Sequence, residues 1–295
     1  MDKYLITGAS GYLATTLIPL AAQSAEVIGV ARHIAAICDP AQSIELDISD
    51  RNRVLDVIMA EKPDVIIHCA ACNPGGDRDM MYRVNQLGSE HIALAARRAG
   101  CRLVAVSSDT VFNGKDAPFA DDATAEPVPE NHYAVSKALA EKVILETLDD
   151  AIVVRTSLIY GLDSIDRGTQ GFAKRIERGE TLKLFNDVLR QPVLASSLSH
   201  CLLRLASDLA AERGTMNFAG SESLSREQFG VKLLDYWRVD YEGLMESVSG
   251  EGLADVPMDL RMSLARADSL GLPTPGVSLA IEQKKQNSKA RGNLK

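Results

Sequence analysis

The sequence contains no long apolar run, and no stretch reaches the roughly 18 apolar residues that a membrane-spanning helix needs. Residues 1–3 lead directly into an apolar strand, without the apolar region and small-residue cleavage site of a signal peptide. The five cysteines, at positions 38, 69, 72, 101 and 201, are odd in number and too scattered for a disulfide framework. These absences predict a soluble, cytoplasmic protein with reduced thiols and no membrane partner.

The sequence also lacks an excess of positive charge. Its formal net charge is −8, so a nucleic-acid partner is not indicated. No internal repeat or low-complexity core segment is visible. The 295 residues are 46% hydrophobic and 24% charged, which is ordinary globular composition, and the length suits one large or two smaller domains.

A glycine-rich turn lies between a short β-prone run at residues 3–7 and a helical pattern that continues to about residue 23. Its sequence, GASGYLA, matches the G-x-x-G-x-x-G/A pattern of dinucleotide-binding loops. Gly8 would permit the tight turn, and Gly11 would let the backbone approach a pyrophosphate at the helix N-terminus. Ala14 replaces the third glycine, which is tolerable because that position affects only the packing of the helix against the strand. A plain strand–helix turn is the alternative.

The end of the second predicted strand, residues 26–32, bears on the choice of cofactor. NAD-specific sites usually place an acidic residue there, about 20 residues after the loop, to bind the ribose 2′-hydroxyl. This chain has Ala31, Arg32 and His33 instead. Because a guanidinium suits a 2′-phosphate, we expect NADP(H) to be preferred, with NAD(H) as the alternative. A solvated Arg32 is the plain interpretation.

Strands and helices alternate through the first part of the chain. Further strands are predicted at residues 43–48, 63–68, 101–106 and 151–155. Helices are predicted at residues 50–61, 77–100 and from the Pro129 loop to about 148. This alternation predicts an α/β fold, a doubly wound parallel sheet of the Rossmann type, over residues 1–160.

The pattern becomes less regular after residue 160. A helix at 172–179, a strand at 182–185, a helix at about 197–209 and a strand at 216–220 are predicted. Ser225 and Gln228 fit a capping box on a further helix. We therefore expect a smaller, mixed α/β substrate-binding lobe over residues 161–283, able to contribute back to the core. Residues 284–295 are polar and basic, and we expect them to be a disordered tail.

The Cys69-Ala70-Ala71-Cys72 stretch follows a buried strand. A C-x-x-C pattern can indicate a redox or zinc site, but no second C-x-x-C or histidine pair follows, so no metal site is expected. We favour small residues that line the cofactor at the carboxyl end of a strand.

Three residues with acid–base chemistry come next. The strand at 101–106 delivers Ser108 to the carboxyl edge of the sheet, where ligands bind in open α/β folds. Tyr133 and Lys137, four residues apart, would share one face of a helix. A free phenol has a pKa near about 10, and a nearby cation would lower it toward the range of general acid–base catalysis. A solvated helix face and a turn-forming serine are the alternatives.

Together these elements resemble the extended short-chain dehydrogenase/reductases. Residues 107–114, SSDTVFNG, are similar to the STDYVFDG stretch of the dTDP-4-dehydrorhamnose reductase branch, although Thr110 and Asn113 depart from it. The resemblance continues through residues 190–193, 214–220 and 257–261, and it spans almost the whole chain.

The resemblance implies an NADPH-dependent oxidoreductase that reduces the 4-keto group of a sugar nucleotide, as in dTDP-rhamnose biosynthesis. Ser108 would hydrogen-bond the carbonyl, Tyr133 would protonate it, and Lys137 would lower the tyrosine pKa and bind the nicotinamide ribose. Related dehydratases carry an Asp-Glu pair, whereas Thr110 follows Asp109 here, which disfavours dehydration. Arg32 argues against the permanently bound NAD of the epimerases.

Two sets of binding residues are expected. The cofactor set is Gly8, Ser10, Gly11, Tyr12, Leu13, Arg32, Asp47, Ile48, Cys69, Ala70, Ala71, Asn85, Tyr133 and Lys137. The substrate set is Ser108, Asp109, Val111 and Arg190. Arg190 would either meet a pyrophosphate or be paired at the surface.

Two other functions stay open. One is an NADP-binding regulatory or scaffold protein, as in the methionine adenosyltransferase regulatory subunit. The other is a reductase or epimerase of a different carbonyl substrate. The resemblance also suggests a homodimer, because many relatives are dimers.

Overall fold

The computed structural model describes residues 1–34 and 41–292, with side chains described through residue 288. Cys38 and residues 293–295 of the predicted tail lie outside the described residues. A search of the described helices finds none that is both long and apolar enough to cross a membrane.

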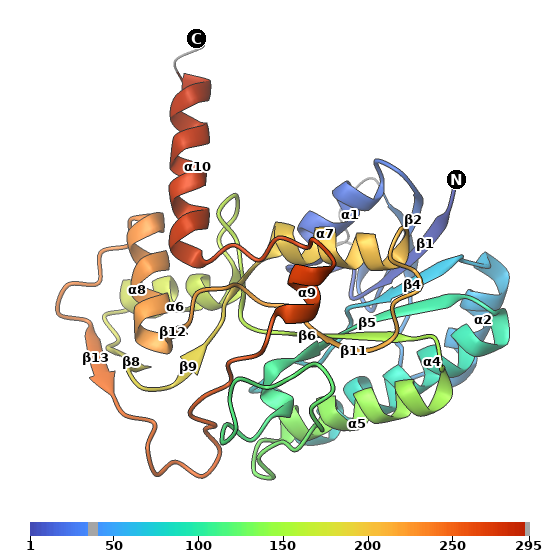
Figure 1. Cartoon of the computed structure of the whole chain (residues 1–295), viewed down its shortest axis with the longest axis horizontal. Coiled ribbons are helices and arrows are strands. Elements are labelled where there is room, and N and C mark those ends of the chain that lie inside the picture. Colours follow the sequence, from blue (N-terminus) through green and yellow to red (C-terminus); the bar gives the residue numbers. More distant parts are fainter. Residues whose placement is uncertain (35–40, 293–295) are drawn as a thin grey trace.

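The centre of the molecule is a parallel sheet, confirming the predicted α/β fold (Figure 1). Within the described residues it has seven strands, in the order β11-β6-β5-β4-β1-β2-β3. These strands are β1 (Lys3–Thr7), β2 (Glu26–Ala31), β3 (Gln42–Glu45), β4 (Val65–His68), β5 (Arg102–Ser108), β6 (Ile152–Thr156) and β11 (Gly214–Asn217). The strand order reverses between β1 and β4, which is the point where doubly wound sheets bind their ligands.

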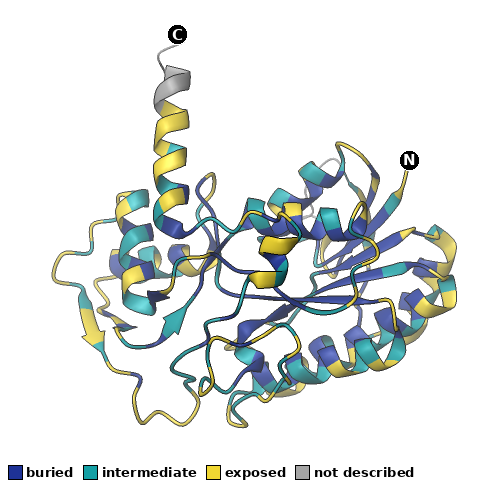
Figure 2. Ribbon diagram, in the orientation of Figure 1, coloured by how far each residue is buried: buried dark blue, intermediate teal, exposed yellow. Residues whose placement is uncertain are grey.

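Helices cover both faces of the sheet (Figure 1). One face carries α1 (Ala14–Ala21) and α7 (Ala195–Ala206), and the other carries α2 (Arg51–Glu61), α4 (Gly88–Ala99) and α5 (His132–Thr147). Successive residues of a strand point to opposite faces, so Tyr4 and Ile6 pack in one apolar cluster and Leu5 in the other. Buried residues fill both interfaces (Figure 2). The sheet is thus a rigid platform whose carboxyl edge is free to hold a site.

The predicted strands and helices of the first 160 residues are confirmed, with shifted boundaries. The strand expected at 43–48 ends at Glu45, and the long helix expected at 77–100 is interrupted. It consists of α3 (Arg78–Met81), a π-helix, η2 (Tyr82–Leu87), and α4. A π-helical turn is rare and is frequently found at functional sites. Hydropathy does not distinguish it from an α-helix.

Residues beyond 160 divide between the sheet and a second group of elements. The predicted helix and strand near 197–220 are confirmed as α7 and β11, which return to the central sheet through the pairing of β11 with β6. The others form three two-stranded sheets and their helices. They are β7 (Ile159–Tyr160), α6 (Arg167–Glu177), β8 (Leu182–Phe185), β9 (Leu189–Arg190), β10 (Val193–Leu194), β12 (Leu224–Ser225), α8 (Arg226–Trp237) and β13 (Met245–Val248).

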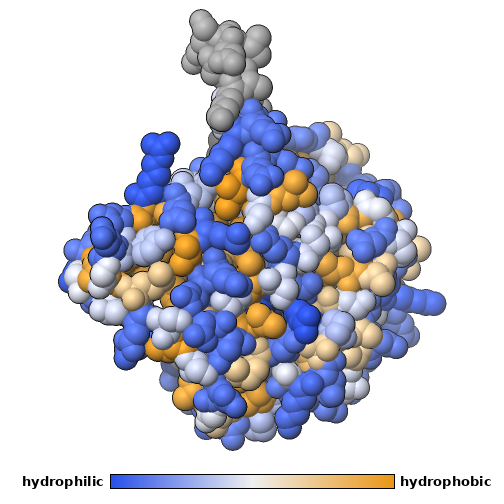
Figure 3. Space-filling model, turned by 60° about the vertical axis from the view of Figure 1, so that its left-hand side comes forward, coloured by the Kyte–Doolittle hydropathy of each residue, from blue (hydrophilic) through white to orange (hydrophobic). Residues whose placement is uncertain are grey.

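The helix expected at 172–179 begins earlier, because Asp166 caps α6 through a bond from the Thr169 amide at 3.0 Å. The predicted capping box of Ser225 and Gln228 is present at the start of α8. On the face shown in Figure 3, apolar residues are interspersed with hydrophilic ones. That face therefore shows no broad apolar patch.

The C-terminal segment differs from the expected disordered tail. After α9 (Ala265–Ser269), the helix α10 (Val277–Gly292) continues through most of residues 284–295 and projects from the body (Figure 1). Ala280 packs in the apolar cluster that includes Phe229, and Lys284 contacts the Asp163 carboxylate. The polar, basic composition suggested disorder. Such a composition is equally compatible with a solvated helix when no proline interrupts it, so composition alone does not distinguish the two.

Candidate active site

The turn between β1 and α1 brings its backbone against the start of the loop after β4. Gly8 has φ of +70°, and a Cβ there would lie 2.8 Å from the Ala70 Cα. The Gly11 amide donates to the Gly8 carbonyl at 2.8 Å. Only glycine at position 8 fits both the backbone angle and the space. The turn thus has the close backbone approach that the motif predicted.

A chain of hydrogen bonds beneath the turn holds β1, β4 and α4 together. The Thr7 hydroxyl accepts the Cys69 and Ala70 amides at 3.1 Å, so its own proton is free for His68 Nδ1 at 2.7 Å. His68 Nε2 lies 3.0 Å from the Ser89 hydroxyl. Burial, with a smaller effect of the Lys137 charge, lowers the pKa of His68 to about 3. A neutral imidazole suits this position, because it can accept at Nδ1 and donate at Nε2.

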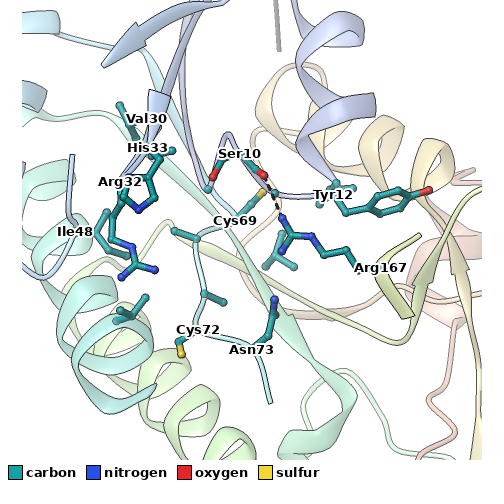
Figure 4. Close-up of a pocket in the computed structure, with 18 of the residues that line it drawn as sticks. Ser10, Tyr12, Val30, Arg32, His33, Ile48, Cys69, Cys72, Asn73 and Arg167 are labelled. Atoms are coloured by element: carbon teal, nitrogen blue, oxygen red, sulfur yellow. Dashed lines mark hydrogen bonds between the residues drawn. The ribbon is translucent and has the colours of Figure 1, made fainter. Parts of the chain in front are cut away.

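A cavity of about 450 Å³ opens beside the turn, at the carboxyl edge of the sheet (Figure 4). Its wall includes most of the predicted cofactor residues, namely Gly8, Ser10, Gly11, Tyr12, Leu13, Arg32, Asp47, Ile48, Cys69, Ala70 and Ala71. Residues that the sequence reading did not select line it too, among them His33, Asn73, Val106, Asp166 and Arg167. Three of the predicted cofactor residues, Asn85, Tyr133 and Lys137, lie outside that lining.

One end of the cavity carries opposite charges. Arg32 follows β2, and Asp47 follows β3. Burial alone would raise the pKa of Asp47, but the Ser49 amide, 2.9 Å away, and the charge of Arg32 lower it overall. Asp47 is therefore a carboxylate that contributes negative charge beside the guanidinium of Arg32.

The two cysteines of the C-x-x-C stretch lie in the cavity wall. Burial raises the pKa of Cys69 to about 12, so its thiol stays protonated. Among the described residues, no group of three or more His, Cys, Asp and Glu side chains is placed to hold a metal ion. Cys69 and Cys72 line the cofactor-side cavity instead.

Asn85 acts as a clamp within the π-helix. Its side chain is fully buried and bonds the Cys72 amide at 2.7 Å and the Cys72 carbonyl at 3.0 Å. Its amide also donates to the Ser136 hydroxyl at 2.9 Å, and Ser136 bonds the Tyr133 carbonyl at 2.7 Å. Asn85 thus joins the loop after β4 to the helix that carries the predicted proton donor.

Ser108 and Tyr133 meet at the end of β5. The Ser108 hydroxyl accepts the Thr110 hydroxyl proton at 2.9 Å and the Thr110 amide at 3.2 Å. Burial first, and then the charge of Asp109, raise the pKa of Tyr133 to about 12. The Ser108 hydroxyl and the Arg190 guanidinium act in the opposite direction but are weaker. The phenol therefore holds its proton at neutral pH.

The prediction that Lys137 lowers the pKa of Tyr133 is wrong for this structure. Lys137 is 5% exposed, and its ammonium donates to the Val106 carbonyl at 2.8 Å. Burial lowers its own pKa to about 8, although Glu141 raises it in part. The i, i+4 spacing places both side chains on one face but does not fix how far each is buried. Burial and Asp109 outweigh the cation at the phenol.

Asp109 is fully buried and forms a two-pronged ion pair with Arg190 of β9. Arg190 Nε donates to Asp109 Oδ2 at 2.7 Å, and Nη2 bonds Oδ1. Arg190 is therefore paired with a buried carboxylate and not at the open surface. Its contact with a pyrophosphate stays a prediction. Val111, the other predicted substrate residue, is fully buried in an apolar cluster with Phe112.

Two arginines of the second group of elements lie at the site although no sequence pattern predicts them there. Arg167, the first residue of α6, donates to the Ser10 carbonyl at 3.2 Å (Figure 4). Arg226, the first residue of α8, is half-buried, and desolvation and the Arg190 charge lower its pKa to about 10. Neither arginine belongs to a local motif, so only the three-dimensional structure brings them to the site.

The comparisons with known proteins agree with this geometry. A model of the RmlD substrate binding domain matches residues 2–265. A "dTDP-4-keto-6-deoxy-D-glucose reductase" of Streptomyces niveus is 31% identical over 69% of this chain and 68% of its own. A "dTDP-4-dehydrorhamnose reductase" of Mycobacterium tuberculosis is 30% identical over 76% of this chain and 71% of its own.

Solved structures share the fold. The crystal structure of a hypothetical dTDP-4-dehydrorhamnose reductase from Sulfolobus tokodaii is 28% identical and superimposes with a TM-score of 0.79. The superposition covers 95% of this chain and 98% of the other. The family model spans most of the chain, and the fold extends over nearly all of it. The chain therefore belongs to the family defined by the RmlD substrate binding domain.

Proposed function

We propose that this protein is an NADPH-dependent reductase of the 4-keto group of a sugar nucleotide, the reaction type named for its Streptomyces and Mycobacterium relatives. The observation that carries the proposal is the position of Ser108 and Tyr133. They stand together at the carboxyl edge of the sheet, next to the fully buried Asp109, while the glycine turn opens a cavity at the same edge.

The cavity fits a dinucleotide. Gly8 and Gly11 line the cavity, and neither carries a side chain that would keep a phosphate group from the backbone of the turn. Arg32 at the far end suits the 2′-phosphate of NADP, and NAD is the second choice. We propose that the predicted residues that line the cavity hold the cofactor. Asn85 would fix the loop after β4, and Lys137 would bind the nicotinamide ribose.

When bound, the reduced nicotinamide supplies a hydride to the carbonyl carbon. Tyr133 gives its proton to the carbonyl oxygen, so the C=O group becomes CH–OH and the tyrosine is left as a phenolate. Ser108 donates a hydrogen bond to the same oxygen and orients it. The raised pKa of Tyr133 keeps the phenol loaded with its proton before the reaction.

Arg190, which lowers the pKa of Tyr133, lies where it can stabilise the phenolate that forms. The Lys137 ammonium, which donates to the Val106 carbonyl, is kept for the nicotinamide ribose. Asp109 sets the position of Arg190, and Val111 packs beneath the same turn. We propose that the substrate lies over Ser108, Asp109, Val111 and Arg190, with its carbonyl toward Tyr133.

We also propose that the protein works in the cytoplasm, where NADPH is supplied, and that it forms a homodimer. The described cysteines, Cys69, Cys72, Cys101 and Cys201, are free thiols, as a reducing compartment allows. Light scattering after size-exclusion chromatography measures the assembly directly. A mass near 31.8 kDa would contradict the dimer.

The test of the activity is NADPH consumption by the purified protein with a dTDP-4-dehydro-6-deoxy sugar. We expect turnover with the wild type and a fall of about 100-fold or more in kcat for Tyr133→Phe, which removes only the hydroxyl that donates the proton. The variant should still bind NADPH, as measured by the quenching of protein fluorescence.

Two outcomes would overturn the proposal. Tight NADPH binding without turnover on this substrate would favour another carbonyl compound or a regulatory role with a partner protein. Undiminished turnover in Tyr133→Phe would remove the tyrosine from the reaction.

A further inference from the structure

Arg167 and Arg32 occupy opposite sides of the cofactor-side cavity (Figure 4). Arg32 follows β2 of the central sheet, whereas Arg167 begins α6, well outside the glycine-loop segment. The only hydrogen bond of the Arg167 guanidinium within the described residues goes to the Ser10 carbonyl, at 3.2 Å. A guanidinium has five N–H donors, so most remain available to a ligand.

The carboxylates next to Arg167 in sequence have other partners. Asp166 accepts the Thr169 amide at 3.0 Å and the Thr169 hydroxyl at 2.6 Å, and it is 5% exposed. Asp163 contacts Lys284 of α10. Neither carboxylate is recorded in an ion pair with Arg167 in the part of the chain that the structure describes. The positive charge of Arg167 is thus available to a ligand at the cavity wall.

The segment that carries Arg167 is held over the glycine turn. The Tyr12 hydroxyl, from the turn itself, donates to the Ser164 carbonyl at 2.8 Å. The Tyr236 hydroxyl of α8 donates to the Leu162 carbonyl at 2.7 Å. These two bonds fix residues 162–164 between the turn and α8, so the guanidinium stays close to Ser10.

We infer that Arg167, held beside the glycine turn, binds the diphosphate of the dinucleotide. The inference rests on the proposed function, because it requires a dinucleotide in this cavity. Ser10 precedes Gly11, the residue where the backbone can approach a phosphate, so a cation bonded to Ser10 lies at the diphosphate end of the cavity. A guanidinium can bond two phosphate oxygens at once.

This assignment divides the cofactor between two arginines. NADPH and NADH share the diphosphate but differ in the 2′-phosphate. Arg167 should therefore serve both cofactors, whereas Arg32 should serve NADPH alone. Adenosine 2′-monophosphate carries the 2′-phosphate without a diphosphate, so its binding should depend on Arg32 and not on Arg167.

The experiment measures the Kd of NADPH, NADH and adenosine 2′-monophosphate by calorimetry for four proteins: the wild type, Arg167→Ala, Arg32→Ala and Lys174→Ala. We expect Arg167→Ala to raise the Kd of NADPH and of NADH by about ten-fold each, the loss of a charge-assisted bond, and to leave adenosine 2′-monophosphate unchanged. Arg32→Ala should weaken NADPH and adenosine 2′-monophosphate while sparing NADH. Lys174, an exposed residue of the same helix, is the matched control and should change nothing.

Arg167→Lys keeps the charge but not the two-pronged geometry, and we expect it to recover part of the affinity. Thermal melting of each variant identifies any that fail to fold. Unchanged Kd values for NADPH and NADH in a folded Arg167→Ala would overturn the inference, as would a loss confined to NADPH. If the wild type binds neither dinucleotide, the proposed function fails and this inference with it.

Discussion

Two buried arginine–carboxylate pairs flank the proposed proton donor and its lysine, and they differ in how fully they are enclosed. Glu141, one turn after Lys137 on α5, pairs with Arg155, and both side chains are 3% exposed. Asp109, next to Ser108, pairs with Arg190, whose side chain is 13% exposed. The first pair lies behind the lysine, and the second lies beside the tyrosine.

The pair behind Lys137 is closed. Arg155 Nη2 bonds Glu141 at 2.8 Å, and its Nη1 donates to the Asp121 and Ala123 carbonyls at 3.2 and 2.8 Å. The guanidinium also lies 4.9 Å from the centre of the Phe112 ring. Both side chains are almost fully enclosed by the protein, and Glu141 raises the pKa of the neighbouring Lys137.

The pair beside Tyr133 joins two parts of the chain. Asp109 follows β5 of the sheet, and Arg190 belongs to β9 of the second group of elements. Both groups act on the pKa of Tyr133, Asp109 upward and Arg190 downward. An arginine–carboxylate pair that is fully enclosed thus contributes to stability, whereas the same kind of pair beside the site changes the pKa of Tyr133.

Breaking the closed pair should have the largest effect on stability. Glu141→Gln leaves the buried Arg155 charge uncompensated, and we expect the free energy of unfolding to fall by about 3 kcal/mol. Urea unfolding measures it. The matched control is Glu146→Gln on the same helix, whose exposed pair with Lys142 is 3.8 Å long and should contribute less than about 0.5 kcal/mol. Equal effects of the two variants would contradict the comparison.

Breaking the open pair should change the chemistry more than the stability. Asp109→Asn removes a charge that raises the pKa of Tyr133 and leaves Arg190, which lowers it, so that pKa falls. A protonated tyrosine is the proposed acid, and activity is lost as the pH rises through its pKa. The alkaline limb of kcat against pH should therefore move to lower pH in the variant.

The stability of Asp109→Asn should fall by only about 1–2 kcal/mol, because Arg190 can reach solvent. Asp259→Asn, which breaks the more exposed pair with Arg261, is the control and should leave the pH profile in place. An alkaline limb that stays where it is in Asp109→Asn would separate this carboxylate from the tyrosine.

Much of the fold follows from local patterns. The buried apolar runs predict β1, β2, β4, β5 and β6, and the glycine turn predicts where the sheet holds its cavity. The pairing of β11 with β6 joins residues about 60 positions apart, and no local pattern records it. The π-helix around Asn85 depends on its hydrogen bonds to Cys72 and Ser136, which are contacts made only in the folded chain.

The site shows the same limit. Ser108, Tyr133 and the cavity-wall residues follow from motif and spacing, because strand ends and helix faces converge at one edge. The upward shift of the Tyr133 pKa does not follow from the sequence, because it depends on burial and on Asp109 and not on the spacing to Lys137. Arg190 lies 81 positions from its partner Asp109 in the sequence, and Arg167 lies 157 positions from Ser10. Such contacts require the tertiary structure.

The proposed reaction is tested most directly by following the hydride itself. NADPH deuterated at its transferable position would be incubated with the protein and a dTDP-4-dehydro-6-deoxy sugar, and the product examined by mass spectrometry and proton NMR. We expect one deuterium on the new carbinol carbon and none elsewhere in the sugar. A product that carries no deuterium, or carries it at another carbon, would contradict reduction of the 4-keto group by this site.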